Sequence, residues 1–231
     1  MRKAALIPLI WLALAGAARA ERPPVVVELF TAQGCEACTG ANELVGKLAA
    51  RKGVLPLTFS VDYWDYTGWT DTFAKAEFVE RQKAYVDKLG LDEPYTPQVV
   101  VDGRAQAPGV QADKVERLLR EASRAPRDPP DIAFIGARRA DVGSGRPPKG
   151  GAEVWLIRYD PRERDVEVKA GDNRGKTVTH RNLVREVHKL GAWRGRPTAY
   201  RLPKSAEEGL DSVIVVQGAG GGRILAAEQK H

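Results

Sequence analysis

The chain of 231 residues contains two cysteines, Cys35 and Cys38, with two residues between them. A pair with this spacing can perform reversible thiol–disulfide exchange, bind a soft metal through two thiolates, or form a structural cross-link. A cross-link this short closes almost no loop, so it removes little entropy from the unfolded chain. The spacing therefore favours a redox-active pair, with Cu(I) binding and an inert disulfide as the alternatives.

The segments around the pair predict where the two sulfurs lie. Residues 25–30, VVVELF, are typical of a strand buried on both faces, and residues 38–53 have apolar side chains at helical spacing before a terminal glycine. Cys35 is therefore expected at or just before a helix N-terminus, where unpaired N–H groups favour a thiolate. Cys35 is predicted to attack, and Cys38, one turn on, to resolve the mixed disulfide.

Glu36 stands between the two cysteines, and its carboxylate opposes a thiolate on Cys35. A less stable thiolate makes a less oxidising disulfide. The sequence therefore predicts a protein nearer the reducing end of the range than the strongest periplasmic oxidants, although solvent screens an exposed Glu36.

The segment after the pair alternates between strand and helix patterns. Alternating apolar residues predict strands, whereas helix formers followed by a glycine predict helices. The predicted elements are, in chain order, a strand in 54–64, a helix in 71–90, two strands within 95–109 joined by a turn at Asp102-Gly103, and a helix in 111–123.

This order of elements is the order of the thioredoxin fold, and residues 25–123 resemble a thioredoxin-like domain. Three motifs, VVVELFTAQGCEAC, VDYWDYTGWTD and YTPQVVVDGR, more narrowly resemble those of secreted bacterial proteins in the domain-of-unknown-function family 1223. The resemblance implies a mixed central sheet with flanking helices. It implies no settled substrate.

The resemblance also implies roles for three further residues. Pro97, preceded by Thr96, matches the proline whose peptide bond is cis and which faces the cysteine pair in thioredoxin folds. Glu28 lies near the place where thioredoxins keep a buried carboxylate that manages the proton of the second thiol, although its register is one residue off. A buried Glu28 needs a hydrogen-bonding partner or a proton, so a proton relay and a structural hydrogen bond are both open.

Residues 61–71, VDYWDYTGWTD, concentrate aromatic and acidic side chains. The favoured interpretation is a loop fixed to the core by its aromatic rings, because such rings dominate core energetics. The alternative is a wall of a substrate groove beside Cys35, since the same residue types are enriched at interfaces.

The first twenty residues predict export. Two basic residues precede an apolar stretch that ends in Ala18-Arg19-Ala20, which is typical of a signal peptide cleaved after Ala20. The apolar stretch is shorter than the roughly 20 residues that span a bilayer. A periplasmic or secreted protein is expected, with no membrane segment after cleavage.

Residues 123–131, SRAPRDPPD, combine prolines with alternating charges and predict a linker. The predicted organisation is a signal peptide (1–20), an α/β thioredoxin-like domain (21–126) and a β-rich, sandwich-like module (127–231). In the second half, short apolar runs between turns predict strands. Residues 179–193 are predicted as a strand, and GAGGGR at 218–223 as a hairpin turn.

Charge and histidines limit the partners. The formal net charge of +6 falls to about +3 without the signal, which does not indicate nucleic-acid binding. His180 and His188 match no zinc spacing and are predicted to be solvent-exposed polar residues. The second half is basic, so we hypothesise that it recruits an acidic redox partner. Its clustered basic residues are Arg174, Lys176, Arg181 and Arg185.

Together these features predict an exported thiol–disulfide oxidoreductase, or a redox-active thioredoxin-like protein, that needs no organic cofactor. Its predicted site consists of Cys35, Cys38, Thr96, Pro97 and Glu28, and its predicted partners are protein or small-molecule thiols and disulfides. The alternatives are a copper-handling protein that uses the same thiols and a non-catalytic binding module.

Overall fold

The computed structural model describes residues 22–231. The predicted signal peptide, residues 1–20, lies outside this range, so its cleavage after Ala20 stays a prediction. Within the described range, no helix combines the length and the apolar character that crossing a bilayer requires.

The first half of the described chain contains the strands and helices that its sequence predicts. They are, in chain order, β1 (Val25–Thr31), α1 (Cys38–Ala49), β2 (Val54–Ser60), the one-turn 3-10 helix η1 (Asp65–Thr67), α2 (Ala76–Leu89), β3 (Gln98–Val101), β4 (Ala105–Pro108) and α3 (Ala112–Arg124). Helix α2 begins later than the pattern predicts, because Lys75 is extended, with φ −141° and ψ 141°.

The second half consists of strands and connecting turns. They are β5 (Ile132–Ile135), β6 (Arg139–Val142), β7 (Ala152–Asp160), β8 (Arg164–Glu167), β9 (Thr177–His180), β10 (Leu183–Trp193), β11 (Thr198–Arg201), β12 (Asp211–Gly218) and β13 (Ile224–Lys230). The predicted strand at 179–193 is confirmed and is divided between β9 and β10. The predicted turn at 218–223 is also confirmed, because it joins the paired strands β12 and β13.

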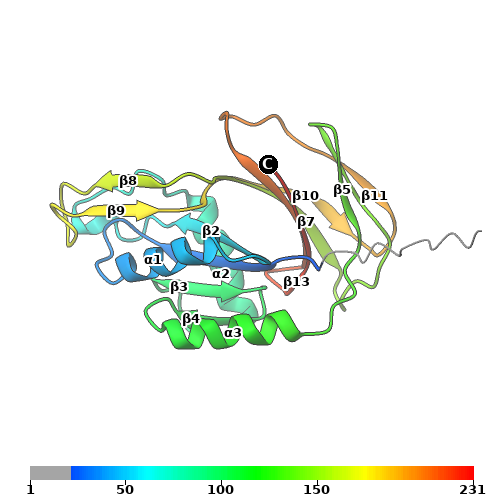
Figure 1. The fold of residues 1–231 in the computed structure, drawn as a ribbon, viewed down its shortest axis with the longest axis horizontal. Helices are drawn as coiled ribbons and strands as arrows, with labels where there is room; N and C mark the ends of the chain where they lie inside the picture. Colours follow the sequence, from blue (N-terminus) through cyan, green and yellow to red (C-terminus); the bar gives the residue numbers. More distant parts are fainter. Residues whose placement is uncertain (1–21) are drawn as a thin grey trace, which may run out of the picture.

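Eight strands from both halves form one mixed sheet in the order β13-β12-β7-β10-β2-β1-β3-β4 (Figure 1). β1 runs parallel to β2 and antiparallel to β3. The sheet therefore continues across the boundary expected between residues 126 and 127. The second half extends this sheet and adds a three-stranded sheet, β11-β6-β5, where the sequence predicted a sandwich-like module of its own.

The two halves meet where β10 pairs with the edge of β2. Leu183 lies opposite Thr58 in a parallel register, and the Thr58 N–H donates to the Asn182 carbonyl at 3.0 Å. The Asn182 amide donates to the Pro56 carbonyl at 2.8 Å. Asn182 has φ +49°, a left-handed conformation that asparagine adopts more readily than most residues. The sequence did not predict the pairing of β10 with β2, because no local sequence pattern encodes it.

Helices cover both faces of the first-half part of the sheet. On one face, Val27 and Leu29 of β1 pack with Val45 of α1 and Leu119 of α3. On the other face, an aromatic core that includes Phe30 packs against α2 and extends to β7 and β12 of the second half. The three-stranded sheet packs separately on the far end of the large sheet through a cluster that includes Trp193. Both halves therefore share the core that holds β1 in place.

A buried polar network crosses this shared core. Arg81 Nε on α2 donates to Glu28 Oε1 on β1 at 2.6 Å, and the Tyr85 hydroxyl donates to the other carboxylate oxygen. Arg81 Nη2 also donates to Gln217 Oε1 on β12 at 3.2 Å. Burial raises the pKa of Tyr85 well above its ordinary value, and the nearby Glu28 carboxylate adds to this effect. The network links β1, α2 and the second half.

We expect Glu28→Leu to lower the free energy of unfolding by roughly 3–5 kcal/mol, because it leaves the Arg81 guanidinium buried and unpaired. Urea denaturation followed by circular dichroism measures the change. Glu116→Leu is the matched control: its partner Arg51 lies at 2.8 Å but the two side chains are 35% and 43% accessible to solvent, so a loss of at most about 1 kcal/mol is expected. Equal losses in the two variants would contradict the structural role of the buried pair.

Candidate functional site

Cys35 and Cys38 form a disulfide with an S–S distance of 2.13 Å. The pair lies between the end of β1 and the start of α1, as the sequence predicts. The helix begins at Cys38, so Cys35 precedes its first residue by one turn, and the Cys38 N–H donates to the Cys35 carbonyl at 3.1 Å. The helix N-terminus is therefore at Cys38 itself.

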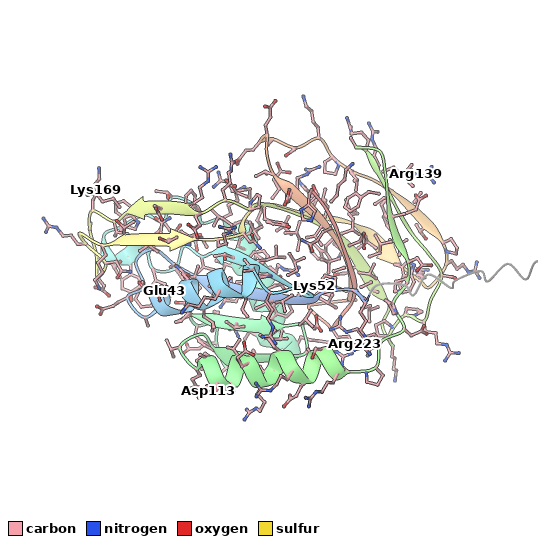
Figure 2. All side chains as sticks on the ribbon, viewed as in Figure 1. Glu43, Lys52, Asp113, Arg139, Lys169 and Arg223 are labelled. Atoms are coloured by element: carbon pink, nitrogen blue, oxygen red, sulfur yellow. A yellow bond between two sulfur atoms is a disulfide. The ribbon has the colours of Figure 1, made fainter. Side chains whose placement is uncertain are left out.

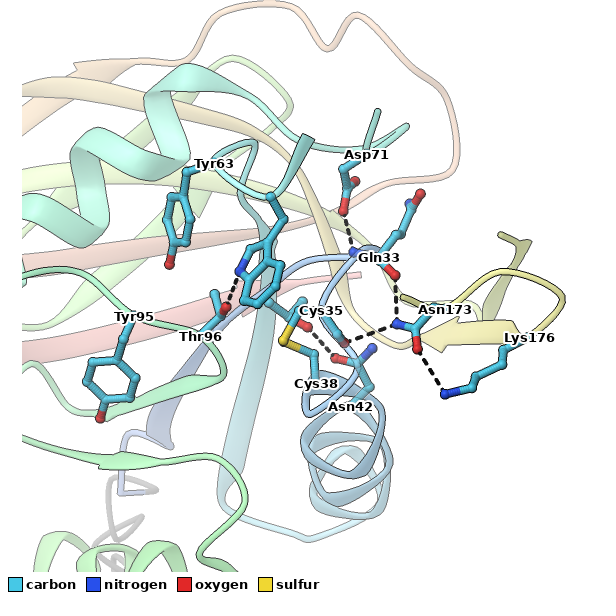
Figure 3. The surroundings of a disulfide bond; sticks show 12 residues. Gln33, Cys35, Cys38, Asn42, Tyr63, Asp71, Tyr95, Thr96, Asn173 and Lys176 are labelled. Atoms are coloured by element: carbon cyan, nitrogen blue, oxygen red, sulfur yellow. Dashed lines mark hydrogen bonds between the residues drawn. A yellow bond between two sulfur atoms is a disulfide. The ribbon is translucent and has the colours of Figure 1, made fainter. Parts of the chain in front are cut away.

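The disulfide is buried in the protein. Cys35 exposes 1% of its surface and Cys38 none. Figure 3 shows that the turn carrying the pair lies among side chains from three other segments. These segments are the aromatic loop of residues 61–72, the loop that ends at Thr96, and the turn between β8 and β9. A reactant can reach either sulfur only if surrounding side chains move aside.

The aromatic loop holds the cysteine turn through Gln33. Asp71 Oδ2 accepts the Gln33 N–H at 2.7 Å (Figure 3), and the Trp69 indole donates to Gln33 Oε1 at 2.8 Å. Burial raises the pKa of Asp71 to about 6, although backbone N–H groups donate to its carboxylate. The loop therefore fixes the backbone two residues before Cys35.

Most of the aromatic rings in the loop tie it to the core, as the favoured interpretation expects. The Tyr63 hydroxyl donates to Gln82 at 3.2 Å, and the Trp64 indole donates to the Thr96 hydroxyl at 2.6 Å. Tyr66 differs, because it is 82% exposed. Its ring stacks on Trp64, with 6.3 Å between the ring centroids. A role of this loop as a groove wall stays a prediction.

The second half contributes Asn173, in the turn between β8 and β9. Its side chain is fully buried, and Nδ2 donates to the Gln33 carbonyl at 2.8 Å and to the Cys35 carbonyl at 3.0 Å. On the same turn, Lys176 Nζ donates to Glu36 at 2.8 Å and lowers the pKa of that carboxyl. The Lys176 charge offsets the Glu36 charge on which the predicted reducing tendency rests. The sequence contains no signal for these contacts, because Asn173 and Cys35 lie 138 positions apart.

The Thr96–Pro97 peptide bond is cis, which confirms the prediction from the resemblance. Figure 3 shows Thr96 beside the disulfide, on the side opposite Asn173. Pro97 lies close to α1: a Cβ atom on Gly109 would stand 3.1 Å from Pro97 Cβ and 2.7 Å from Ala41 Cβ. Glycine at position 109 therefore lets the backbone after β4 lie against both Pro97 and Ala41 of α1.

Glu28 lies away from the pair. Its polar contacts are with Arg81 and Tyr85, and none is with either cysteine in the described part of the chain. These contacts support the structural role of Glu28. No described contact supports its predicted role in proton transfer.

Asn42 is a polar side chain near the pair that the sequence-based prediction missed. It lies one turn after Cys38 on the same face of α1, and it is buried. Its Oδ1 accepts the Thr31 hydroxyl at 2.8 Å, whereas Nδ2 has no hydrogen-bonding partner among residues 22–231. The sequence did contain a signal for this residue. Asn42 lies four positions after Cys38 and is polar, whereas its neighbours on that helix face are apolar.

Comparison with known proteins identifies the family. A family model described as a protein of unknown function, DUF1223, matches residues 26–217. The chain belongs to the DUF1223 family. A crystal structure of a protein from Agrobacterium tumefaciens is similar, with 31% identity, a TM-score of 0.72, and 91% of this chain and 95% of that chain covered.

A second similar structure is HBP35 of Porphyromonas gingivalis, with a TM-score of 0.58 at 13% identity. The alignment covers 90% of this chain and 74% of that chain, and at this identity it shows a likeness of fold alone. No curated protein matches this DUF1223 chain.

The two histidines of the second half behave differently in this DUF1223 protein. His180 is fully buried with its ring edge-on to Phe73, so its predicted exposure was wrong; the β8–β9 pairing turns its side chain inward. His188 is partly exposed, and its Nε2 lies 3.1 Å from Glu186. Within residues 22–231, no three His, Cys, Asp or Glu side chains are grouped to hold a metal ion.

The basic cluster predicted to recruit an acidic partner is largely paired within the DUF1223 chain. Lys176 pairs with Glu36, Arg181 with Glu163 at 3.4 Å, and Arg185 with Glu207 at 2.9 Å. These pairs reduce the positive charge that remains available to another molecule. Recruitment of an acidic partner stays a prediction.

We expect the stability of the DUF1223 protein to fall in acid because of His180. Burial lowers the pKa of His180 from 6.5 to about 4, so the folded state binds fewer protons than the unfolded state between these values. Its contribution is complete above pH 6.5 and decreases by roughly 2–3 kcal/mol as the pH approaches 4. Urea denaturation at pH 7, 5.5 and 4.5, compared with His180→Phe, isolates the effect. Parallel pH profiles for the two proteins would refute it.

Proposed function

We propose that this DUF1223 protein is an exported thiol–disulfide oxidoreductase of the thioredoxin-like class, with Cys35 and Cys38 as its redox pair. In the exchange, a substrate thiolate attacks one sulfur, the Cys35–Cys38 bond breaks and a mixed disulfide forms. A second substrate thiol then displaces the enzyme sulfur. The substrate leaves as a disulfide, while both cysteines become thiols; the reverse sequence reduces a substrate disulfide.

The observation that carries this proposal is the position of the disulfide. It closes the turn between the central strand β1 and α1 and ends at Cys38, the first residue of the helix, where unpaired N–H groups and the helix dipole stabilise a thiolate on a released sulfur. As a structural cross-link, the same bond contributes only about 2 kcal/mol in the chain-entropy relation, because it closes so short a loop. The location of the disulfide therefore favours a redox role over a purely structural cross-link.

The unpaired amide of Asn42 also supports a redox role. A buried N–H without a partner costs free energy in the disulfide form. After reduction, Cys38 carries a thiol or thiolate that can accept a hydrogen bond from Asn42 Nδ2, one helical turn away. The surroundings of the pair therefore include a donor that the reduced state can use.

The remaining support is the arrangement around the pair. The cis Thr96–Pro97 bond, the β1–α1 turn and the order of elements agree with the thioredoxin-like class, and the predicted signal peptide agrees with export. Protein or small-molecule thiols and disulfides are the proposed partners. Copper handling by the same two thiolates is the alternative function.

We expect Cys35→Ser to abolish thiol–disulfide exchange and Cys38→Ser to accumulate a mixed disulfide on Cys35. The reason is that the attacking cysteine forms the covalent intermediate and the other releases it. Full-length protein is incubated with an oxidised peptide substrate and glutathione, and mass spectrometry identifies the trapped species. Accumulation in Cys35→Ser instead would reverse the two roles.

The exchange assay and a Cu(I) titration of the reduced wild-type protein together separate the alternatives. If wild-type protein exchanges no thiols but its reduced form binds Cu(I) stoichiometrically and tightly, copper handling replaces the proposed function. If neither reaction occurs, the disulfide is inert and the binding-module alternative gains support.

We expect Asn42→Leu to make the protein more reducing. The substitution removes the donor that stabilises reduced Cys38 and the unsatisfied amide of the disulfide form, and both effects favour oxidation. In glutathione redox buffers, the equilibrium constant for reduction should fall about tenfold, which is about 30 mV for two electrons. The control, Glu43→Gln, changes an exposed residue of the same helix and should shift the constant less than about twofold. Equal constants for Asn42→Leu and wild type would refute the role of Asn42.

A further inference from the structure

The β8–β9 hairpin, residues 164–180, lies over the cysteine turn without joining either larger sheet. Its two strands pair only with each other in the described part of the chain. Figure 1 shows the hairpin extending from the large sheet towards the end of the molecule where α1 begins. A two-stranded hairpin is marginally stable alone, so its position depends on what it touches.

The hairpin touches the cysteine turn through a small set of contacts. Asn173 provides the two hydrogen bonds to the Gln33 and Cys35 carbonyls, and Lys176 provides the ion pair with Glu36. That ion pair is solvent-exposed, with 48% of the Lys176 side chain and 70% of the Glu36 side chain accessible, so it holds weakly. Asn173 therefore makes the main polar contacts that hold the hairpin against the cysteine turn.

The hairpin also closes against the aromatic loop. Gly171 has φ +71°, and a Cβ atom there would stand 2.9 Å from Thr67 Oγ1. Beneath the turn, Val168 and Val178 are buried, and β9 packs beside α1. The hairpin thus bridges α1 and the aromatic loop, the two segments that flank the disulfide.

The hairpin is a local unit of the chain, since its two strands pair with each other and with no other described strand. It is joined to the large sheet only at β7 and, through residues 181–182, at β10, and the backbone bonds within it do not depend on the cysteine turn. For example, the Gly175 N–H donates to the Val168 carbonyl at 2.8 Å, within the hairpin itself. Lifting it breaks the contacts of Asn173 and Lys176 and exposes buried side chains such as Val168 and Val178, while the hairpin keeps its own ladder.

We propose that the β8–β9 hairpin is a lid that gates access to the Cys35–Cys38 disulfide, held shut by Asn173. The lid would regulate access to the disulfide. Its biological role rests on the proposed oxidoreductase function, whereas its opening and closing do not. A reductant reacts at a rate proportional to the fraction of molecules with the lid open. A protein partner must wait for this opening or displace the contacts of Asn173.

The test uses a water-soluble trialkylphosphine, which reduces disulfides without a partner protein. The phosphine gives its electron pair to the disulfide and takes oxygen from water, leaving two thiols and a phosphine oxide.

We expect Asn173→Ala to raise the rate constant for reduction of the full-length protein about tenfold, because the lid opens more often. Lys176→Ala should raise it less than about threefold. Lys169→Ala is the matched control; this exposed residue of the same hairpin, labelled in Figure 2, should leave the rate unchanged.

A second measurement separates lid opening from unfolding. If the lid opens locally, the reduction rate of wild-type protein rises less steeply with urea than global unfolding does, because opening the hairpin exposes less surface than unfolding the whole chain. A urea dependence equal to that of global unfolding would overturn the proposal, as would an Asn173→Ala rate equal to the wild-type rate. So would wild-type protein that is reduced as fast as an unstructured peptide containing residues 33–40.

The outcomes keep the lid and the proposed function distinct. Phosphine reduction that depends on Asn173, without exchange with thiol substrates, would support the lid and refute the oxidoreductase. Exchange that proceeds at the same rate in wild type, Asn173→Ala and Lys169→Ala would support the oxidoreductase and refute the lid.

Discussion

The edge of β2 is the constraint on which the rest of the structure depends. Its backbone groups on the side away from β1 lie inside the protein and therefore need partners. Asn182 and the start of β10 provide them. Because β9 reaches β10 through residues 181 and 182 alone, this pairing also determines where the β8–β9 hairpin lies. One strand pairing thus joins the two halves and brings Asn173 to the cysteine turn.

The cysteine turn depends on that arrangement for a physical reason. A disulfide has no strong hydrogen-bonding group and can be buried at little cost, but the backbone of the turn that carries it cannot. Asp71 satisfies the Gln33 N–H, and Asn173 satisfies the Gln33 and Cys35 carbonyls. One of these side chains comes from each half of the chain. The site is therefore complete only when β10 is paired with β2, and a chain that ends near residue 130 lacks both β10 and Asn173.

The sequence allowed prediction of what local patterns encode. The apolar run at 25–30, the helical spacing after Cys38 and the Asp102-Gly103 turn each specify an element through their own residues, and the structure contains all three. Contacts across long sequence separations were not predictable in this way. The pairing of β10 with β2 and the two bonds of Asn173 depend on which strand edge needs covering, and no short motif encodes that. His180 was misjudged for the same reason, because its burial follows from how the hairpin packs.

The two amides near the disulfide act on different properties of the proposed reaction. Asn173 binds backbone carbonyl oxygens, which exist equally in the oxidised and reduced protein, so its contacts alter how often the disulfide is reached and leave the redox equilibrium largely unchanged. Asn42 lies one helical turn from Cys38 and has an unpaired amide, and the ability of the Cys38 sulfur to accept a hydrogen bond changes on reduction, so Asn42 is proposed to alter the equilibrium itself. Because one residue lies on the second-half hairpin and the other on α1, the rate of access and the reduction potential can change independently by substitution. In this protein the rate of the proposed reaction can therefore be adjusted without changing its driving force.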